Sequence, residues 1–173
     1  MSRPIRIVPH DPQWPDHYAR EHGRISHTLG RRVSVIEHIG STAVKDLATK
    51  PIIDIMAGAA ASTTAEDCLR PLAEIGYTEV TAQPEIPDWH YCIARSGSNL
   101  SFHLHLVTHP SLHWDRHILF RDYQRRHREA AGQYGELKTR LARECTADRQ
   151  TYTEGKAAFA RRIEGLAHGA GSR

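Results

Sequence analysis

The stretch that decides the fold is residues 33–58, VSVIEHIGSTAVKDLATKPIIDIMAG, in which two apolar runs flank a short polar segment. The first run, residues 33–39, is rich in β-branched side chains and stops at Gly40, which is typical of a β-strand. The second run, residues 51–58, has the same character, and Gly40-Ser41-Thr42 forms the turn after the first. The segment therefore predicts a strand–turn–strand unit.

A helix is expected on each side of this unit. Residues 12–29 can begin a helix with Asp11 as its cap and Pro12 in its first turn. Apolar side chains recur along this segment at spacings that fit one helical face: Trp14, Tyr18, Ile25 and Leu29. Residues 63–75 carry a second helical pattern that stops at Gly76. The expected order is helix, strand, turn, strand, helix.

The rest of the chain divides into a loop, a hairpin and a helical last third. Two prolines and the lack of a period predict a loop at residues 81–88. Residues 91–95 and 101–108 predict a hairpin around the turn sequence SGSN. Three helices and a frayed tail are expected after it: residues 111–127, 129–144, 148–167 and, for the tail, 168–173. No repeat or linker interrupts the chain, so residues 1–173 are expected to form one domain.

Composition narrows the class of protein. A chain of 173 residues can bury about two-thirds of its unfolded surface. No apolar run approaches the roughly 18 residues that span a bilayer, and the N-terminus lacks a signal peptide, so we expect a cytoplasmic protein without a membrane partner. A net charge of +3 is too small to indicate a nucleic-acid partner. Three dispersed cysteines favour neither disulfides nor a zinc site: Cys68, Cys92 and Cys145.

A carboxylate and two imidazoles stand out against the strand pattern. Asp54 lies in the middle of an apolar strand, where an unpaired charge is costly. Strand alternation places His103 and His105 together on one face, opposite the apolar residues of their strand. Beside Asp54 they could form a two-histidine, one-carboxylate site for a divalent ion, or they could simply hydrogen-bond that carboxylate.

The turn between the first two strands is a candidate phosphate site. The backbone amides of Gly40-Ser41-Thr42 and its two hydroxyls can cradle a phosphate, and Lys50 can add positive charge. Such turns also serve as plain helix caps, so both interpretations stay open.

The helix expected at residues 111–127 is rich in basic side chains. His109, His113 and His117 recur every four residues, but a solvated face is the favoured interpretation because Pro110 separates the first from the rest. One or two of the arginines spread around this helix are expected to reach the cleft, and Arg121 is the candidate.

Several stretches occur in order along the chain: IVPHDPQWP (7–15), IEHIGSTAV (36–44), KPIIDIM (50–56), HLHLV (103–107), LFRDYQRRH (119–127), LKTRLA (137–142) and YTEGKAAF (152–159). Together they resemble the GrpB family, also called UPF0157, over about nine-tenths of the chain. The resemblance implies an α+β, nucleotidyltransferase-like fold: a small mixed sheet flanked by helices, with the glycine-serine turn and the Asp54 strand where that superfamily holds nucleotide phosphates. Some members of the family are fused to a dephospho-coenzyme A kinase.

One departure from the superfamily pattern concerns the metal. Active nucleotidyltransferases carry two carboxylates spaced D-x-D on this strand, whereas this chain has Asp54 and Met56. Thioether sulfur is a poor ligand for magnesium. The later-strand carboxylate position is taken by His103 or His105.

The leading hypothesis is an enzyme that binds a nucleoside triphosphate and transfers a nucleotidyl group to a small acceptor. Its expected phosphate ligands are Gly40, Ser41 and Thr42, with Lys50 or Arg121 as charge stabilisers. The expected catalytic and metal-binding set is Asp54, His103 and His105, with Mg, Mn or Zn as the divalent ion. The alternatives are a catalytically silent module that binds a nucleotide or coenzyme A precursor, and a metal enzyme that uses the Asp/His/His set on a small molecule.

Overall fold

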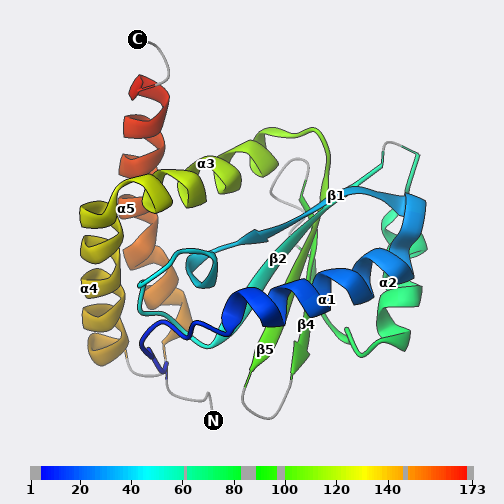
Figure 1. The fold of residues 1–173 in the computed structure, drawn as a ribbon, viewed down its shortest axis with the longest axis horizontal. Helices are drawn as coiled ribbons and strands as arrows, with labels where there is room; N and C mark the ends of the chain where they lie inside the picture. Colours follow the sequence, from blue (N-terminus) through cyan, green and yellow to red (C-terminus); the bar gives the residue numbers. More distant parts are fainter. Residues whose placement is uncertain (1–4, 61, 83–88, 97–99, 146–147, 171–173) are drawn as a thin grey trace.

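The computed structural model of the chain describes residues 5–60, 62–82, 89–96, 100–145 and 148–170 (Figure 1). Four parts of the prediction lie outside these ranges: residues 97–99 of the expected SGSN turn, most of the expected loop at 81–88, the helix break near Thr146 and the last three residues of the expected tail. Within them, no helix is long and apolar enough to cross a membrane.

A five-stranded mixed sheet forms the centre of the molecule, in the order β1-β2-β5-β4-β3. Its central pair, β2 and β5, is parallel, and the outer pairs are antiparallel. The strand bounds are β1 Val33–Ile39, β2 Ile52–Ala59, β3 Glu79–Ala82, β4 Trp89–Ser96 and β5 Ser101–Thr108. The small mixed sheet that the resemblance implied is therefore confirmed.

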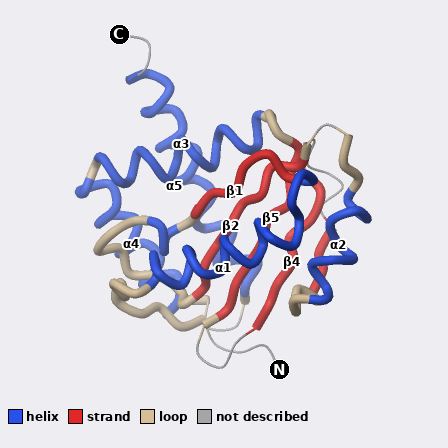
Figure 2. Tube along the Cα trace, turned by 45° about the vertical axis from the view of Figure 1, so that its right-hand side comes forward, coloured by secondary structure: helices blue, strands red, loops and turns tan. Residues whose placement is uncertain are grey.

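Five α-helices surround this sheet (Figures 1 and 2). They are α1 Trp14–Leu29, α2 Ala65–Glu74, α3 Leu112–Arg126, α4 Arg128–Glu144 and α5 Arg149–Ala170. Two short 3-10 turns, η1 Gly30–Arg32 and η2 Ser41–Ala43, flank β1. The last three helices make the C-terminal third helical, as expected.

The two faces of the sheet carry different cores because side chains alternate along each strand. On one face, Ile53 and Ile55 of β2 and Leu104 of β5 pack against α1 and α2. On the other, Met56 and residues of α3 form a smaller apolar cluster, and α4 and α5 build a third around Leu47, Ala131 and Tyr134. Asp54, His103 and His105 have the parity of the second face, which places them toward the C-terminal helices.

Several boundaries differ from the sequence-based expectation. Helix α1 begins at Trp14 rather than 12, because the Asp11 carboxylate accepts a hydrogen bond from the Gln13 N–H (2.8 Å) before the helix starts. Strand β3 includes residues 81 and 82, where a loop was expected. The loop prediction is wrong at these two residues because so short a strand forms only through its pairing with β4, which the local sequence does not reveal. Helix α5 extends to Ala170, past the expected end at 167. Cys68 is buried, whereas Cys92 and Cys145 are half-buried, and all three are free thiols.

Candidate functional site

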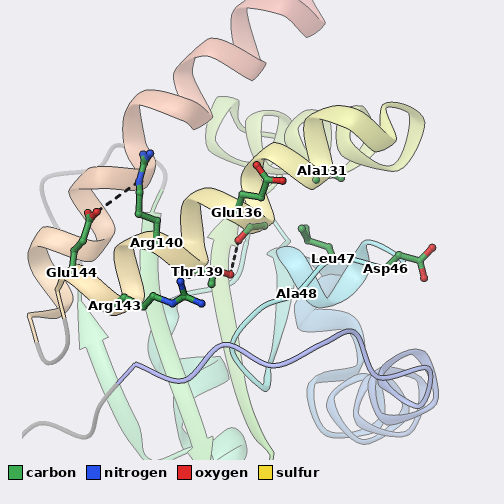
Figure 3. Close-up of a pocket in the computed structure, with 11 residues that line it drawn as sticks. Asp46, Leu47, Ala48, Ala131, Glu136, Thr139, Arg140, Arg143 and Glu144 are labelled. Atoms are coloured by element: carbon green, nitrogen blue, oxygen red, sulfur yellow. Dashed lines mark hydrogen bonds and ion pairs between the residues drawn. The ribbon is translucent and has the colours of Figure 1, made fainter.

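A cavity of about 450 Å³ lies between the second sheet face and the C-terminal helices, and we call it the cleft. Strands β1, β2 and β5 and the turn after β1 form one side, and α3, α4 and α5 form the other. A hollow between α4 and the loop after η2 has a different character (Figure 3). Its lining contains Leu47, Ala131 and Gly135, and its charges are exposed, with Arg140 paired to Glu144 at 4.0 Å. The cleft, by contrast, brings together buried and half-buried carboxylate, imidazole and ammonium groups.

Asp54, His103 and His105 meet at the sheet side of the cleft, as the strand pattern predicted. The parallel register sets Asp54 opposite His103 and Met56 opposite His105. Oδ1 of Asp54 lies 3.6 Å from Nδ1 of His103 and 3.6 Å from Nε2 of His105. These are ion-pair distances, longer than the usual hydrogen bond. Burial pushes the pKa of Asp54 upward, but His105, His103 and Lys50 outweigh it and hold the pKa below its ordinary value, so Asp54 is ionised.

Gly40 allows the Asp54 carboxylate to lie against the turn backbone. Its φ of +68° is in the region that favours glycine, and a Cβ there would lie 2.6 Å from Oδ2 of Asp54. Gly40 and Ser41 line the cleft directly beside this carboxylate. The turn and the Asp54 strand are therefore one structural unit.

Thr42 is held on the other side of the turn. Its Oγ1 lies 3.0 Å from Nε2 of His38, whose ring stacks on Tyr18 at 4.6 Å between centroids. Burial, followed by the charge of Arg125, lowers the pKa of His38 to about 4, so this imidazole is neutral at physiological pH. Thr42 and His38 line a separate hollow next to α1 and not the cleft. The hydroxyl of Thr42 thus holds the turn in place from the side that faces away from the cleft.

Arg121 also lies outside the lining of the cleft. Its Nη1 donates to Oε2 of Glu37 (2.6 Å) and to the carbonyl of His38 (2.9 Å), and its Nε donates to Asp122 (2.8 Å). The side chain is buried and ties α3 to β1. Of the two expected charge stabilisers, the structure brings only Lys50 into the cleft.

Two further lysines line the cleft that were not predicted from the sequence, Lys138 of α4 and Lys156 of α5. Nζ of Lys138 lies 4.8 Å from the centre of the Tyr134 ring. Nζ of Lys156 lies 4.6 Å from the Tyr152 ring, and Nζ of Lys50 lies 5.3 Å from the same ring. Both lysines lie on the apolar, inward-facing side of their helices, and this helical spacing is the feature of the sequence that could have identified them. The stripes are Ala131, Tyr134, Lys138 and Leu141 in α4, and Tyr152, Lys156, Phe159 and Ile163 in α5.

The lysines depress one another's basicity. Burial lowers the pKa of Lys138 to about 7, and the charge of Lys156 adds to this effect. Burial also lowers the pKa of Lys156 to about 8, with a contribution from Lys50. Asp54 raises both pKa values but does not restore them. Asp54 therefore does not compensate for the burial of these ammonium groups and their mutual repulsion.

His117 of α3 is a third imidazole in the lining of the cleft, so the expected solvated face is wrong for this residue. Its Nδ1 lies 3.0 Å from the carbonyl of His113, a contact in which the ring nitrogen donates, and its ring centre is 6.3 Å from that of His105. This bond fixes the tautomer and leaves Nε2 as an acceptor. Burial, followed by the nearby His105, lowers the pKa of His117, which keeps the ring neutral.

The side chains alone do not make a metal cage. Among the described residues, no group of three or more His, Cys, Asp and Glu side chains is arranged to hold a metal ion. Met56, which stands where active nucleotidyltransferases carry a second carboxylate, is fully buried beside Ile39, Val107 and Trp114 and does not face the cleft. Asp54 is thus the carboxylate of the sheet side that is available to a hard cation.

Comparison with known proteins places this geometry in a family. The family model described as GrpB protein matches residues 4–165. The chain belongs to the GrpB family. A crystal structure of the GrpB protein from Enterococcus faecalis has a TM-score of 0.84 and 27% identity, and the match covers 97% of this chain and 100% of that one.

Curated relatives agree with membership of the GrpB family. A UPF0157 protein of Pseudomonas aeruginosa is 36% identical over 94% of this chain and 67% of its own length. One from Halalkalibacterium halodurans is 31% identical over 92% of this chain and 80% of its own. A protein named dephospho-CoA kinase from Mycolicibacterium paratuberculosis is 34% identical, but over 53% of this chain and 24% of its own length.

Proposed function

We propose that the cleft binds the phosphates of a nucleoside triphosphate together with a divalent ion, and that the protein transfers the nucleotidyl group to a small acceptor. The observation that carries this proposal is the convergence, in one cavity, of the Asp54 carboxylate with Lys50, Lys138 and Lys156. A carboxylate beside an excess of ammonium groups suits a ligand that brings negative charge and a cation together.

The phosphate side of the proposal rests on the turn and on Lys50. Gly40 and Ser41 present backbone and a hydroxyl to the cleft without an intervening side chain, and Lys50 lines the same space. Backbone donors at a turn and one lysine are a recurring way to bind phosphate. The Thr42 hydroxyl and the Arg121 guanidinium are assigned no part in this binding, because they contact His38 and Glu37.

The ion would enter with the nucleotide. Magnesium in proteins is usually held by one or two carboxylates together with substrate phosphates, and a three-ligand protein cage is not required. Asp54 supplies one such carboxylate, and His103 and His105 keep it ionised and oriented. A bound ion would supply charge neutralisation at the phosphates. The absence of a three-ligand arrangement among the described residues argues against the Asp/His/His metal enzyme.

The transfer itself has a simple balance. The acceptor oxygen forms a bond to the α-phosphorus, the bond from that phosphorus to the bridging oxygen breaks, and pyrophosphate leaves with the electron pair. The proton of the acceptor passes to water. His117 is neutral and its Nε2 can accept a hydrogen bond in the cleft.

One observation favours a second candidate function, a binding module without transfer. Met56 occupies the position of the second carboxylate of active nucleotidyltransferases, and its apolar packing leaves no room for a second ion there. The same phosphate-binding groups would then hold a nucleotide or a coenzyme A precursor without reaction.

Calorimetry with ATP in the presence of Mg²⁺ or Mn²⁺ tests binding. We expect Asp54→Asn to weaken metal-dependent ATP binding by tenfold or more, because it removes the charge and keeps the shape. Asp115→Asn, an exposed carboxylate of α3 outside the cleft, is the matched control and should bind as wild type does. Equal affinity in all three proteins contradicts the proposal. Release of pyrophosphate from ATP then separates the transferase from the silent module.

A further inference from the structure

The helical side of the cleft contains a buried lysine whose ammonium group makes no hydrogen bond or close ion pair among the described residues. Lys138 has only 2% of its surface exposed, and its Nζ has no hydrogen-bond partner among the described residues. Glu21, a buried charge on the opposite face of the sheet, has its partners within the protein. Its carboxylate accepts hydrogen bonds from Arg24, Arg95 and Tyr77 at 2.7–3.1 Å. An unpaired buried charge costs several kcal/mol of stability. The protein therefore tolerates at Lys138 a cost that it avoids at Glu21.

A second orphaned polar atom lies on the neighbouring helix. Tyr152 is 1% exposed, and its hydroxyl has no hydrogen-bond partner among the described residues. Its ring lies within 5.3 Å of the ammonium groups of Lys50 and Lys156. The residues Lys138 and Tyr152 come from α4 and α5, and both line the cleft. Two helices thus each contribute to the lining of one cavity a residue whose polar atom has no hydrogen-bond partner among the described residues.

The charge balance indicates what would satisfy these donors. Lys50, Lys138 and Lys156 contribute three ammonium groups to the lining, against the carboxylates of Asp54 and Glu164. Glu164 is already paired with Arg116 at 2.8 Å. A multiply charged anion would favour the protonated form of these lysines, and phosphate oxygens accept hydrogen bonds from ammonium and phenol groups.

We propose that Lys138, Lys156 and Tyr152 form a subsite for pyrophosphate on the helical side of the cleft. The proposal rests on the proposed function for its role: the subsite would hold the β- and γ-phosphates of the triphosphate and then the leaving pyrophosphate. When the bond to the α-phosphorus breaks, the electron pair stays on the pyrophosphate oxygen, and the ammonium groups neutralise the charge that develops there. The Gly40 turn and Asp54 would serve the opposite end of the phosphate chain.

Inorganic pyrophosphate alone, without metal or nucleotide, tests the subsite by calorimetry. We expect Lys138→Met to weaken pyrophosphate binding by tenfold or more and Tyr152→Phe by about threefold, the latter change removing only the hydroxyl. Lys45→Met is the control, because Lys45 is exposed and outside the cleft. AMP, which lacks the β- and γ-phosphates, should bind the wild type and Lys138→Met equally. Circular dichroism confirms that each variant is folded.

The results separate this inference from the proposed function. Pyrophosphate binding that depends on Lys138, in a protein that does not bind ATP, supports the subsite and overturns the triphosphate-binding role. ATP binding that depends on Asp54, with pyrophosphate affinity the same in wild type, Lys138→Met and Lys45→Met, overturns the subsite and leaves the proposed function in place. Absence of any pyrophosphate binding to the wild type also overturns the subsite.

Discussion

The carboxylate of Asp54 lies against the backbone of Gly40 so closely that a Cβ on Gly40 would be 2.6 Å from Oδ2 and 3.0 Å from Cβ of Asp54. Two residues that are separated by the η2 turn and the loop after it thus define one surface of the cleft. The turn can keep its place only if residue 40 has no side chain, and Asp54 can reach the cleft only beside such a turn. This contact leads to the first prediction.

Gly40→Ala should displace the Asp54 carboxylate and strain the turn. We expect a loss of about 1–3 kcal/mol in the free energy of unfolding, because φ at this position is +68°. Metal-dependent ATP affinity should fall by tenfold or more in the variant that remains folded. Urea unfolding and calorimetry measure the two effects.

Gly132→Ala in α4 is the matched control for this change. A Cβ at Gly132 would meet nothing within 4 Å, and the residue is helical and exposed. Alanine is favoured over glycine in a helix by about 1 kcal/mol, so this variant should be slightly more stable and bind ATP unchanged. Similar losses in both variants would mean that the contact between Gly40 and Asp54 has no special role.

The buried ammonium group of Lys138 should make the stability of the ligand-free protein depend on pH. Its pKa is about 7 in the folded protein against 10.5 for an ordinary lysine, as burial, Lys156 and Lys50 outweigh Asp54. Between these values the unfolded chain binds more protons, so this group adds stability as the pH rises from about 7. Below pH 7 the folded protein carries the full cost of the buried charge.

Lys138→Met removes that cost and isolates the effect. At pH 6.5 we expect the variant to be more stable than wild type by about 1–3 kcal/mol, as for other buried charges replaced by apolar groups. The advantage should shrink toward pH 9, and urea unfolding at both pH values measures it. A variant that is less stable than wild type at pH 6.5 would show that Lys138 has a structural partner when the protein is folded.

The strand pattern predicted the site at the sheet, and the helices completed it in a way the pattern did not reveal. Alternation placed His103 and His105 on one face of their strand, but the parallel pairing of β2 with β5, which brings them to Asp54, is a property of the fold that alternation does not predict. Lys138 and Lys156 lie on the apolar stripes of α4 and α5, and helical periodicity alone does not say which side chain on such a stripe faces a cavity. Arg121 was misplaced because its partner, Glu37, is distant in sequence and close only in the fold.

Ser41 and Thr42 are adjacent in the turn but face different surroundings, which predicts different effects of removing their hydroxyls. Ser41 lines the cleft, so Ser41→Ala should cost about 1 kcal/mol or more of nucleotide affinity, the scale of one hydrogen bond to a charged group. Thr42→Val should instead cost about 1 kcal/mol of stability, because it breaks the contact with His38 at 3.0 Å.

Thermal shifts with and without ATP distinguish the two variants. The shift produced by ATP should be smaller in Ser41→Ala than in wild type, whereas Thr42→Val should melt lower and keep the full shift. The reverse pattern would assign phosphate binding to Thr42, as the sequence alone suggested, and would make Ser41 a plain component of the turn.

Met56 predicts how any transfer depends on the metal. The side chain is fully buried with Ile39, Val107 and Trp114, so this position offers no carboxylate and cannot easily accept one. Met56→Asp should therefore destabilise the fold by about 3 kcal/mol or more rather than create a second ion site. With Asp54 as the carboxylate, a single ion is expected. His103 and His105 lie against Asp54 and can join that ion only by turning away from the carboxylate, and manganese, cobalt or zinc accept such imidazole ligands more readily than magnesium. Pyrophosphate release from ATP should thus be slow with magnesium and faster with the other three ions. Rapid release with magnesium alone would show that one carboxylate suffices for a hard ion in this cleft, and clear ATP binding without release with any of the four would favour the silent binding module.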